Sequence, residues 1–112
     1  MPAREKRRYV LIKVESTVAV TAEALDAYAK GCVQRLLGVA GLARVKPKLV
    51  HFDEERGAAV FRVARDYVRD FRLSLELAPR TSPLLLRVVR VTGTMRKAVR
   101  VASSMPKSSG NK

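Results

Sequence analysis

The sequence predicts an α+β fold, a two-layer α/β sandwich in which helices cover one face of an antiparallel four-stranded sheet. Some stretches have the alternating or β-branched composition of strands, and others repeat apolar residues at the three- and four-residue spacing of amphipathic helices. These stretches follow the order strand, helix, strand, strand, helix, strand. With 112 residues, the chain suits one domain with one modest core.

The first strand is predicted over residues 7–15, where Val10, Ile12 and Val14 alternate with the residues of the opposite face. A helix follows from Thr21, its N-cap, to Gly38, because apolar residues recur between them at helical spacing. A loop is expected over residues 38–42.

A hairpin is predicted next, with strands at residues 48–53 and 58–64 joined by a polar turn that ends at Gly57. Asp66 is expected to cap the second helix, and Pro79 is expected to end it. The buried stripe of that helix is expected to consist of Tyr67, Val68, Phe71 and Leu75, with Leu77 as a further candidate.

Residues 84–91 form the fourth predicted strand, and a short basic helix follows from Thr94 to about Ala102. Residues 1–102 are therefore expected to form a single domain, to which the charge pattern described below assigns RNA binding, and residues 103–112 a disordered polar tail. The complete order is βαββαβ, the ferredoxin-like arrangement that RNA-recognition domains share.

The charge balance indicates a negatively charged partner. Lysine and arginine total 23 against 10 acids, which gives a net charge of +13. After Glu76 the chain contains eight basic residues and no acid. Such an excess opposes compaction unless a polyanion screens it, so nucleic acid is the first candidate partner and an anionic membrane surface the second.

Cysteine usage and hydropathy exclude several other classes of protein. Cys32 is the only cysteine, so neither an intrachain disulfide nor a thiolate metal cluster can form, which is compatible with a reducing intracellular compartment. The longest nearly apolar stretch, residues 36–43, is far shorter than the roughly 18 residues of a membrane-spanning helix. No membrane-spanning helix is therefore expected, and no membrane partner is predicted apart from the surface-binding alternative.

The sheet face away from the helices lacks the aromatic platform of RNA-recognition domains. In residues 56–63, where the third strand should carry aromatics, the Arg-Gly start is present but Ala58, Val60 and Val63 stand at the aromatic positions. An aliphatic face suits protein docking better than base reading. The predicted partner-docking residues are Tyr9, Leu11, Ala58, Val60 and Arg62. A covered or merely exposed sheet face is the alternative.

The segment TGTMRK at residues 92–97 joins the end of a strand to the start of a helix. Gly93 permits close backbone approach, and the amides near Thr94 can meet a phosphate. An ordinary Thr-capped helix with a solvated basic face is the alternative, but no acid lies within fifteen residues on either side. The first and fourth strands are neighbours in this topology, so the basic residues at the start of the chain are expected to lie beside this segment. The predicted RNA-binding residues are Arg7, Arg8, Gly93, Thr94, Arg96, Lys97 and Arg100.

No catalytic or metal site is predicted. His51 has no companions at metal-ligand spacing, and the carboxylates at residues 53–55 are typical of a solvated hairpin tip. No serine lies in a pattern that would supply both a base and an orienting group. The chain is therefore not expected to be an enzyme on its own.

The sequence resembles the archaeal and eukaryotic ribonuclease P protein component 2 family. The resemblance rests on RRYVL at residues 7–11, VHFD at 50–53 with GAAVFR at 57–62, and VTGTMRK at 91–97. The last segment matches the family's Ser-Gly-Thr-Ile-Arg-Lys-like ending of the fourth strand, with Thr92 for serine and Met95 for isoleucine. The absence of a long acidic C-terminal extension favours an archaeal member.

The resemblance implies a subunit of an RNA-based endoribonuclease that removes the 5′ leader from precursor tRNA. It implies binding to the catalytic ribonuclease P RNA, pairing with the TIM-barrel-like protein component 3 and other protein subunits, and self-association when two such pairs join. The RNA performs the hydrolysis, so no cofactor is expected on this chain and Mg²⁺ is expected in the RNA. The protein is expected to be cytoplasmic.

Two alternatives remain open from the residues alone. One is a ribosomal or ribonucleoprotein-assembly protein that merely neutralises RNA, which predicts copurification with ribosomes. The other is a membrane-surface protein that uses residues 94–102 as a basic amphipathic helix.

Overall fold

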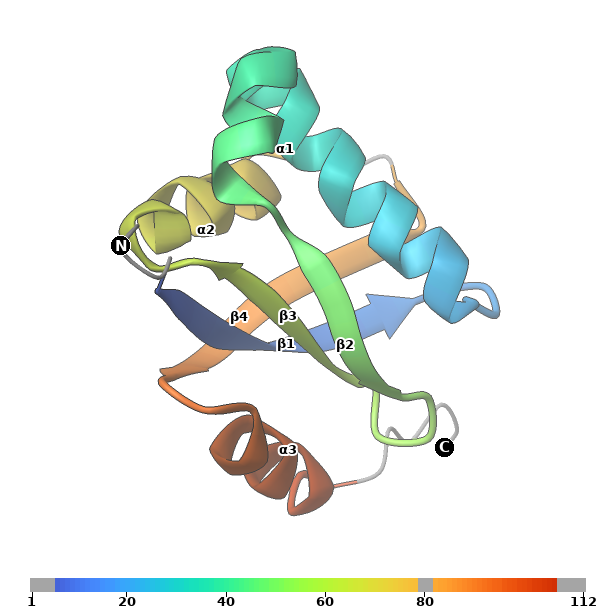
Figure 1. Cartoon of the computed structure of the whole chain (residues 1–112). Helices are drawn as coiled ribbons and strands as arrows, with labels where there is room; N and C mark the ends of the chain where they lie inside the picture. The colour runs from blue at the N-terminus through green and yellow to red at the C-terminus, as the bar shows by residue number, and fades with distance from the viewer. Residues whose placement is uncertain (1–5, 79–81, 107–112) are drawn as a thin grey trace.

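Within residues 6–78 and 82–106, which the computed structural model describes, four antiparallel strands form one sheet in the order β2-β3-β1-β4. The elements in chain order are β1 (Arg7–Ser16), α1 (Ala22–Val45), β2 (Lys48–Asp53), β3 (Ala58–Ala64), a 3₁₀ turn (Arg65–Tyr67), α2 (Val68–Glu76), β4 (Leu84–Thr92) and α3 (Met95–Ser103). Figure 1 shows α1 and α2 on one side of the sheet and α3 on the other. The α+β class, the antiparallel sheet and the short C-terminal helix predicted from the sequence are confirmed.

Helix α1 starts where the sequence predicts but continues beyond its expected end. Thr21 caps it, with Oγ1 accepting a hydrogen bond from the Ala24 amide at 3.1 Å. The helix breaks at Gly38, whose φ of 77° and ψ of −179° suit only glycine, and resumes as far as Val45. The predicted loop at 38–42 is therefore wrong. Leu42 packs on the core and Val45 is buried, so tertiary packing holds this segment in a second helical piece.

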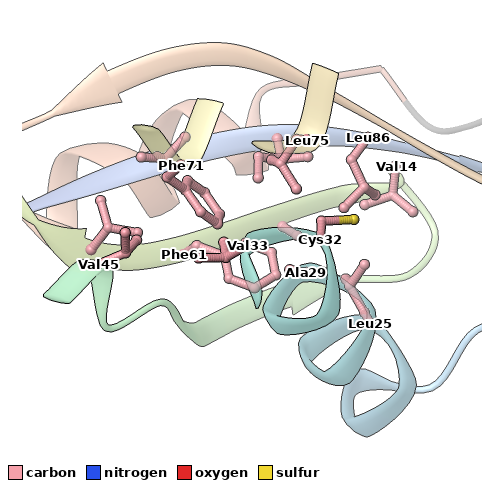
Figure 2. Packing of buried hydrophobic residues seen from close by; sticks show 14 of the residues in the cluster. Val14, Leu25, Ala29, Cys32, Val33, Val45, Phe61, Phe71, Leu75 and Leu86 are labelled. Atoms are coloured by element: carbon pink, nitrogen blue, oxygen red, sulfur yellow. The ribbon is translucent and has the colours of Figure 1, made fainter. Parts of the chain in front are cut away.

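The main core lies between the sheet and the pair of helices α1 and α2. Val10, Ile12 and Val14 face this core, as their alternation predicts. In Figure 2 the rings of Phe61 from β3 and Phe71 from α2 point toward one another, with centroids 5.6 Å apart. This tilted arrangement is favourable for aromatic pairs and ties the sheet to α2.

The entry into α2 differs from the sequence prediction. Asp66 does not cap α2, because it lies in the 3₁₀ turn, where its carboxylate accepts from Arg65 Nε at 3.3 Å. Helix α2 begins at Val68 without a side-chain cap. Phe71 and Leu75 are buried as predicted, but Leu77, which follows the last helical residue, is 59% exposed. The expected end at Pro79 lies outside the described residues.

A second, smaller core lies beneath α3, on the sheet face that the sequence leaves open. Leu11, Ala58 and Val60 from the sheet pack there against Ala98 and Ala102 of α3. Both small residues stand four positions apart, so they share one helix face and let the helix approach the sheet closely. The sandwich thus has a partial third layer.

The chain stays packed against the domain for a few residues after α3. Met105 packs against the smaller core, and its carbonyl accepts a hydrogen bond from Arg56 Nε at 3.0 Å. The predicted tail therefore starts too early, because Ser103 belongs to α3 and Met105 packs on the domain. Residues 107–112 lie outside the described residues.

Candidate nucleic-acid interface

The junction between β4 and α3 is held by two threonines. The buried Thr92 hydroxyl donates to the Thr94 carbonyl at 2.8 Å, which fixes the turn. Thr94 has the extended backbone of an N-cap, and its Oγ1 accepts from the Lys97 amide at 3.2 Å. The predicted start of a helix at Thr94 is confirmed.

Two backbone amides remain open at the start of α3. The first four amides of any helix lack intrahelical partners. Ala98 N–H makes the first helical hydrogen bond, to the Thr94 carbonyl at 3.2 Å, and of the three earlier amides of α3 the cap satisfies that of Lys97. No acceptor among residues 6–78 and 82–106 reaches the amides of Met95 and Arg96. Gly93 beside them is exposed, with open space where a Cβ would lie.

The charge at the start of α3 differs from that of the other two helices. Acids stabilise the positive end of a helix, and α1 and α2 carry Glu23 and Asp70 in their first turns. Helix α3 has no acid there and carries Arg96 and Lys97 instead. The helix dipole, two open amides and two cations therefore act in the same direction, which favours an anion.

The two faces of α3 have different roles. Ala98 and Ala102 are buried on the sheet side, whereas Arg96, Lys97 and Arg100 are exposed on the solvent side. Within the described part of the chain these three cations form no ion pair. The side of α3 that carries Ala98 and Ala102 is thus occupied by the sheet, whereas Met95 is exposed. In that same part of the chain, no helix has both the length and the apolar character needed to cross a membrane.

The first and last strands bring the two basic ends of the domain together. Tyr9 of β1 pairs with Thr92 of β4, so the start of β1 lies beside the start of α3. By strand alternation, Arg7 shares the sheet face of Tyr9 and α3, whereas Arg8 lies on the opposite face with Val10. The predicted adjacency of the first and fourth strands is confirmed. Of the two arginines, Arg7 lies on the α3 side of the sheet and Arg8 does not.

The predicted docking surface needs correction. Leu11, Ala58 and Val60 each have 0% exposure, because α3 covers them. They therefore cannot form an exposed surface while α3 stays docked. Tyr9 and Arg62, at the margin of the covered area, remain half-buried.

Sequence reasoning placed Tyr9 and Arg62 on one surface but missed Lys48, which completes a row across β1, β3 and β2. Arg62 stands opposite Tyr9 on one side and opposite Lys48 on the other. Lys48 follows Lys46 and Pro47 at the start of β2. Only the strand register brings Lys48 opposite Arg62, so the linear sequence carried no signal for that pairing.

Asp53 and Cys32 lie in surroundings that suit structural roles. The Asp53 carboxylate accepts from the Arg56 amide at 3.2 Å and from Arg56 Nη1 at 3.0 Å, and these hydrogen bonds lower the pKa of Asp53. Burial raises the pKa of the Cys32 thiol, which disfavours the reactive thiolate. Among residues 6–78 and 82–106, no three or more His, Cys, Asp or Glu residues gather to hold a metal ion.

Comparisons with known proteins point in one direction. The sequence model described as the Rpp14/Pop5 family matches residues 8–103. Ribonuclease P protein component 2 of Pyrococcus furiosus is 30% identical over 99 residues, covering 87% of this chain and 82% of the relative. The protein of the same name from Pyrococcus horikoshii is 29% identical over the same shares.

A solved structure supports the fold. A chain in the cryo-EM structure of yeast Ribonuclease MRP superposes with a TM-score of 0.65 at 15% identity. The match covers 92% of this chain and 91% of that chain. At this identity the likeness concerns the fold alone.

Proposed function

The chain belongs to the Rpp14/Pop5 family, and we propose that it is a non-catalytic protein subunit of ribonuclease P that binds the catalytic RNA through the start of α3. Binding would favour the active conformation of this RNA, which removes the 5′ leader from precursor tRNA. The proposal rests on the start of α3, where no acid offsets the positive end of the helix dipole. Two backbone amides are open there, and Arg96 and Lys97 are exposed.

The mechanism follows from electrostatics. RNA phosphates accept from the open amides of Met95 and Arg96 and are neutralised by Arg96, Lys97 and Arg100 on the exposed face of α3. Arg7 extends this positive surface from the neighbouring strand. Neutralised phosphates allow RNA helices to approach one another, so the protein favours a compact RNA. Mg²⁺ held by the RNA supplies the hydrolytic chemistry.

Protein partners must use surfaces other than the one that α3 covers. We propose that the chain assembles with protein component 3 and other ribonuclease P subunits in the cytoplasm, and that two copies meet in the larger assembly. Tyr9 and Arg62 are the only members of the predicted docking set that remain partly accessible in the described part of the chain.

The test is reconstitution with the ribonuclease P RNA, the partner proteins and a precursor tRNA. The double variant Arg96→Ala with Lys97→Ala should weaken RNA binding and slow cleavage. The log-log salt slope of affinity should fall by about 0.7 to 0.9 for each phosphate that the variant no longer neutralises. The matched control is Arg44→Ala with Arg69→Ala, which removes two exposed cations from α1 and α2. If cleavage and slope match this control, the assignment is wrong.

A further inference from the structure

An open groove of about 550 Å³ lies beside the start of β2. Its sheet-side wall carries Arg7, Lys46, Lys48 and Arg62, from three different strands and the residue that ends α1. Arg62 and Lys48 lie beyond the residues that α3 buries, on the same sheet face. The groove opens at the β2 edge of the sheet, beside α1 (Figure 1), and Arg62 and Lys48 join it to the sheet face that carries α3.

The α1 side of the groove has a different charge. Asp26 accepts from the Leu49 amide at 2.9 Å through Oδ1 and pairs with Lys30 Nζ at 2.8 Å through Oδ2. Those charges compensate each other. Glu23, in the first turn of α1, adds a negative charge to the same wall. A phosphate is therefore repelled from the α1 wall and attracted to the sheet wall.

The sheet wall holds two cations in a position that costs stability. Lys48 and Arg62 are direct partners in the pairing of β2 with β3. Like charges directly opposite each other in a sheet are destabilising. Neither side chain forms an ion pair with another residue in the described ranges 6–78 and 82–106. An anion bound between them would remove this repulsion, and a guanidinium is well shaped to hold a phosphate.

The third member of the same row is aromatic. Tyr9 pairs with Arg62 and is half-buried at the edge of the area that α3 covers. Nucleic-acid bases stack on such rings only when they are not engaged in a duplex. On its other side Tyr9 pairs with Thr92, so the row leads directly from the start of α3.

We propose that the row Tyr9, Arg62 and Lys48 binds a nucleotide of a single-stranded RNA segment. The phosphate lies between Arg62 and Lys48, and the base or ribose lies against the Tyr9 ring. The segment continues past Thr92 to the phosphate site at the start of α3. This inference rests on the proposed RNA-binding function and assigns Tyr9 and Arg62 to RNA rather than to a protein partner.

The test compares single-stranded and duplex RNA. An oligouridine of about 12 nucleotides, within the length that a single-strand-binding fold covers, and an RNA hairpin of similar charge are titrated with the full chain at several salt concentrations. The double variant Lys48→Gln with Arg62→Gln should lower the oligouridine salt slope by about 0.7 for each phosphate that it no longer neutralises. The control Arg44→Gln with Arg69→Gln should change it less, and hairpin binding should be the same for both variants.

The aromatic contact is tested separately. Tyr9→Leu should weaken oligouridine binding about fivefold or more, as expected when a stacking ring is removed. Tyr9→Phe keeps the ring and should stay within about twofold of the original chain. Near-ultraviolet and far-ultraviolet circular dichroism of each variant establishes that the domain is folded in the titration.

Three results would overturn the inference. The Lys48 and Arg62 variant could match its control on oligouridine, or it could lose hairpin binding equally, or it could keep RNA binding and lose a protein subunit instead. Arg96→Ala with Lys97→Ala, measured in the same titration, separates this inference from the proposed function. If the Arg96 and Lys97 variant binds RNA more weakly and the Lys48 and Arg62 variant does not, the inference on the row is overturned and the proposed function stands. If neither variant binds more weakly than its control, both are overturned.

Discussion

Arg56 joins the β2–β3 turn to the C-terminal end of α3 by donating from Nε to the Met105 carbonyl at 3.0 Å. The same guanidinium donates from Nη1 to the Asp53 carboxylate at 3.0 Å. These residues are far apart in sequence, and the contact closes the smaller core at the end opposite Thr94. The helix that carries the proposed RNA site is therefore held at both of its ends.

Arg56→Ala should loosen this end of α3. The free energy of unfolding should fall by about 1 to 2 kcal/mol, because the variant lacks hydrogen bonds made by a charged group. Hydrogen exchange of the α3 amides should accelerate more than that of β1 and β3. Chemical denaturation and exchange measured by mass spectrometry check both expectations. In the control Arg72→Ala, loss of the exposed pair with Glu76 should cost about 0.5 kcal/mol or less. Equal losses would contradict the role of Arg56.

The Asp53 carboxylate makes stability depend on pH. Hydrogen bonds from Arg56 hold the pKa of Asp53 below its ordinary value in the folded chain. A lowered folded-state pKa adds stability above the unfolded-state value, and this contribution is lost as the pH falls through the folded-state value. Asp53→Asn should therefore be less stable than the original chain at neutral pH.

The difference between the two should shrink as the pH drops below about 4. Urea denaturation between about pH 2 and 6 covers this range. Glu54→Gln changes the neighbouring exposed carboxylate and is the matched control. A stability difference between Asp53→Asn and the original chain that does not vary with pH would exclude this linkage.

Two glycines of α1 should respond in opposite directions to alanine. Gly38 has a positive φ that alanine adopts only with strain, so Gly38→Ala should lower the free energy of unfolding by about 1 to 3 kcal/mol. Gly31 lies in regular helix with open space around it, so Gly31→Ala should raise that free energy by about 0.5 to 1 kcal/mol. Thermal and urea denaturation of both variants measure the pair, and equal signs would contradict the break at Gly38.

Local patterns predicted those parts of the fold that local physics decides. The alternation of Val10, Ile12 and Val14 placed them in the main core, and Thr94 was identified as a cap because its side chain bonds only three residues away. The same reasoning failed after Gly38, where the burial of Val45 holds a second helical piece that the sequence pattern does not show.

The site was only partly predictable from the sequence, because part of it is formed by contacts between residues that are far apart in the chain. The basic segment around Arg96 is visible in the sequence, but the pairing of Lys48 with Arg62 depends on strand register. Likewise, the spacing of Ala98 and Ala102 does not identify the surface on which α3 packs. That surface is the aliphatic sheet face that the sequence pattern assigned to a partner protein.

The docking of α3 can be tested by placing a charge beneath it. Ala98 is fully buried against Leu11 and Val60, so Ala98→Asp would bury a carboxylate without a partner. Release of α3 avoids that cost, while the main core between the sheet, α1 and α2 does not depend on the helix. We expect fast exchange of the α3 amides, slow exchange in β1 and β3, and stronger binding of a hydrophobic dye to the uncovered sheet face.

RNA binding by Ala98→Asp should weaken as well, because the open amides and cations of α3 act together only while the helix is docked. Ser103→Asp adds the same charge at an exposed position of α3 and controls for net charge. If Ala98→Asp bound RNA no more weakly than Ser103→Asp while its α3 amides exchanged freely, the RNA contacts would not need the docked helix. The basic residues of α3 would then bind phosphates as a flexible segment, without the geometry that the docked helix provides.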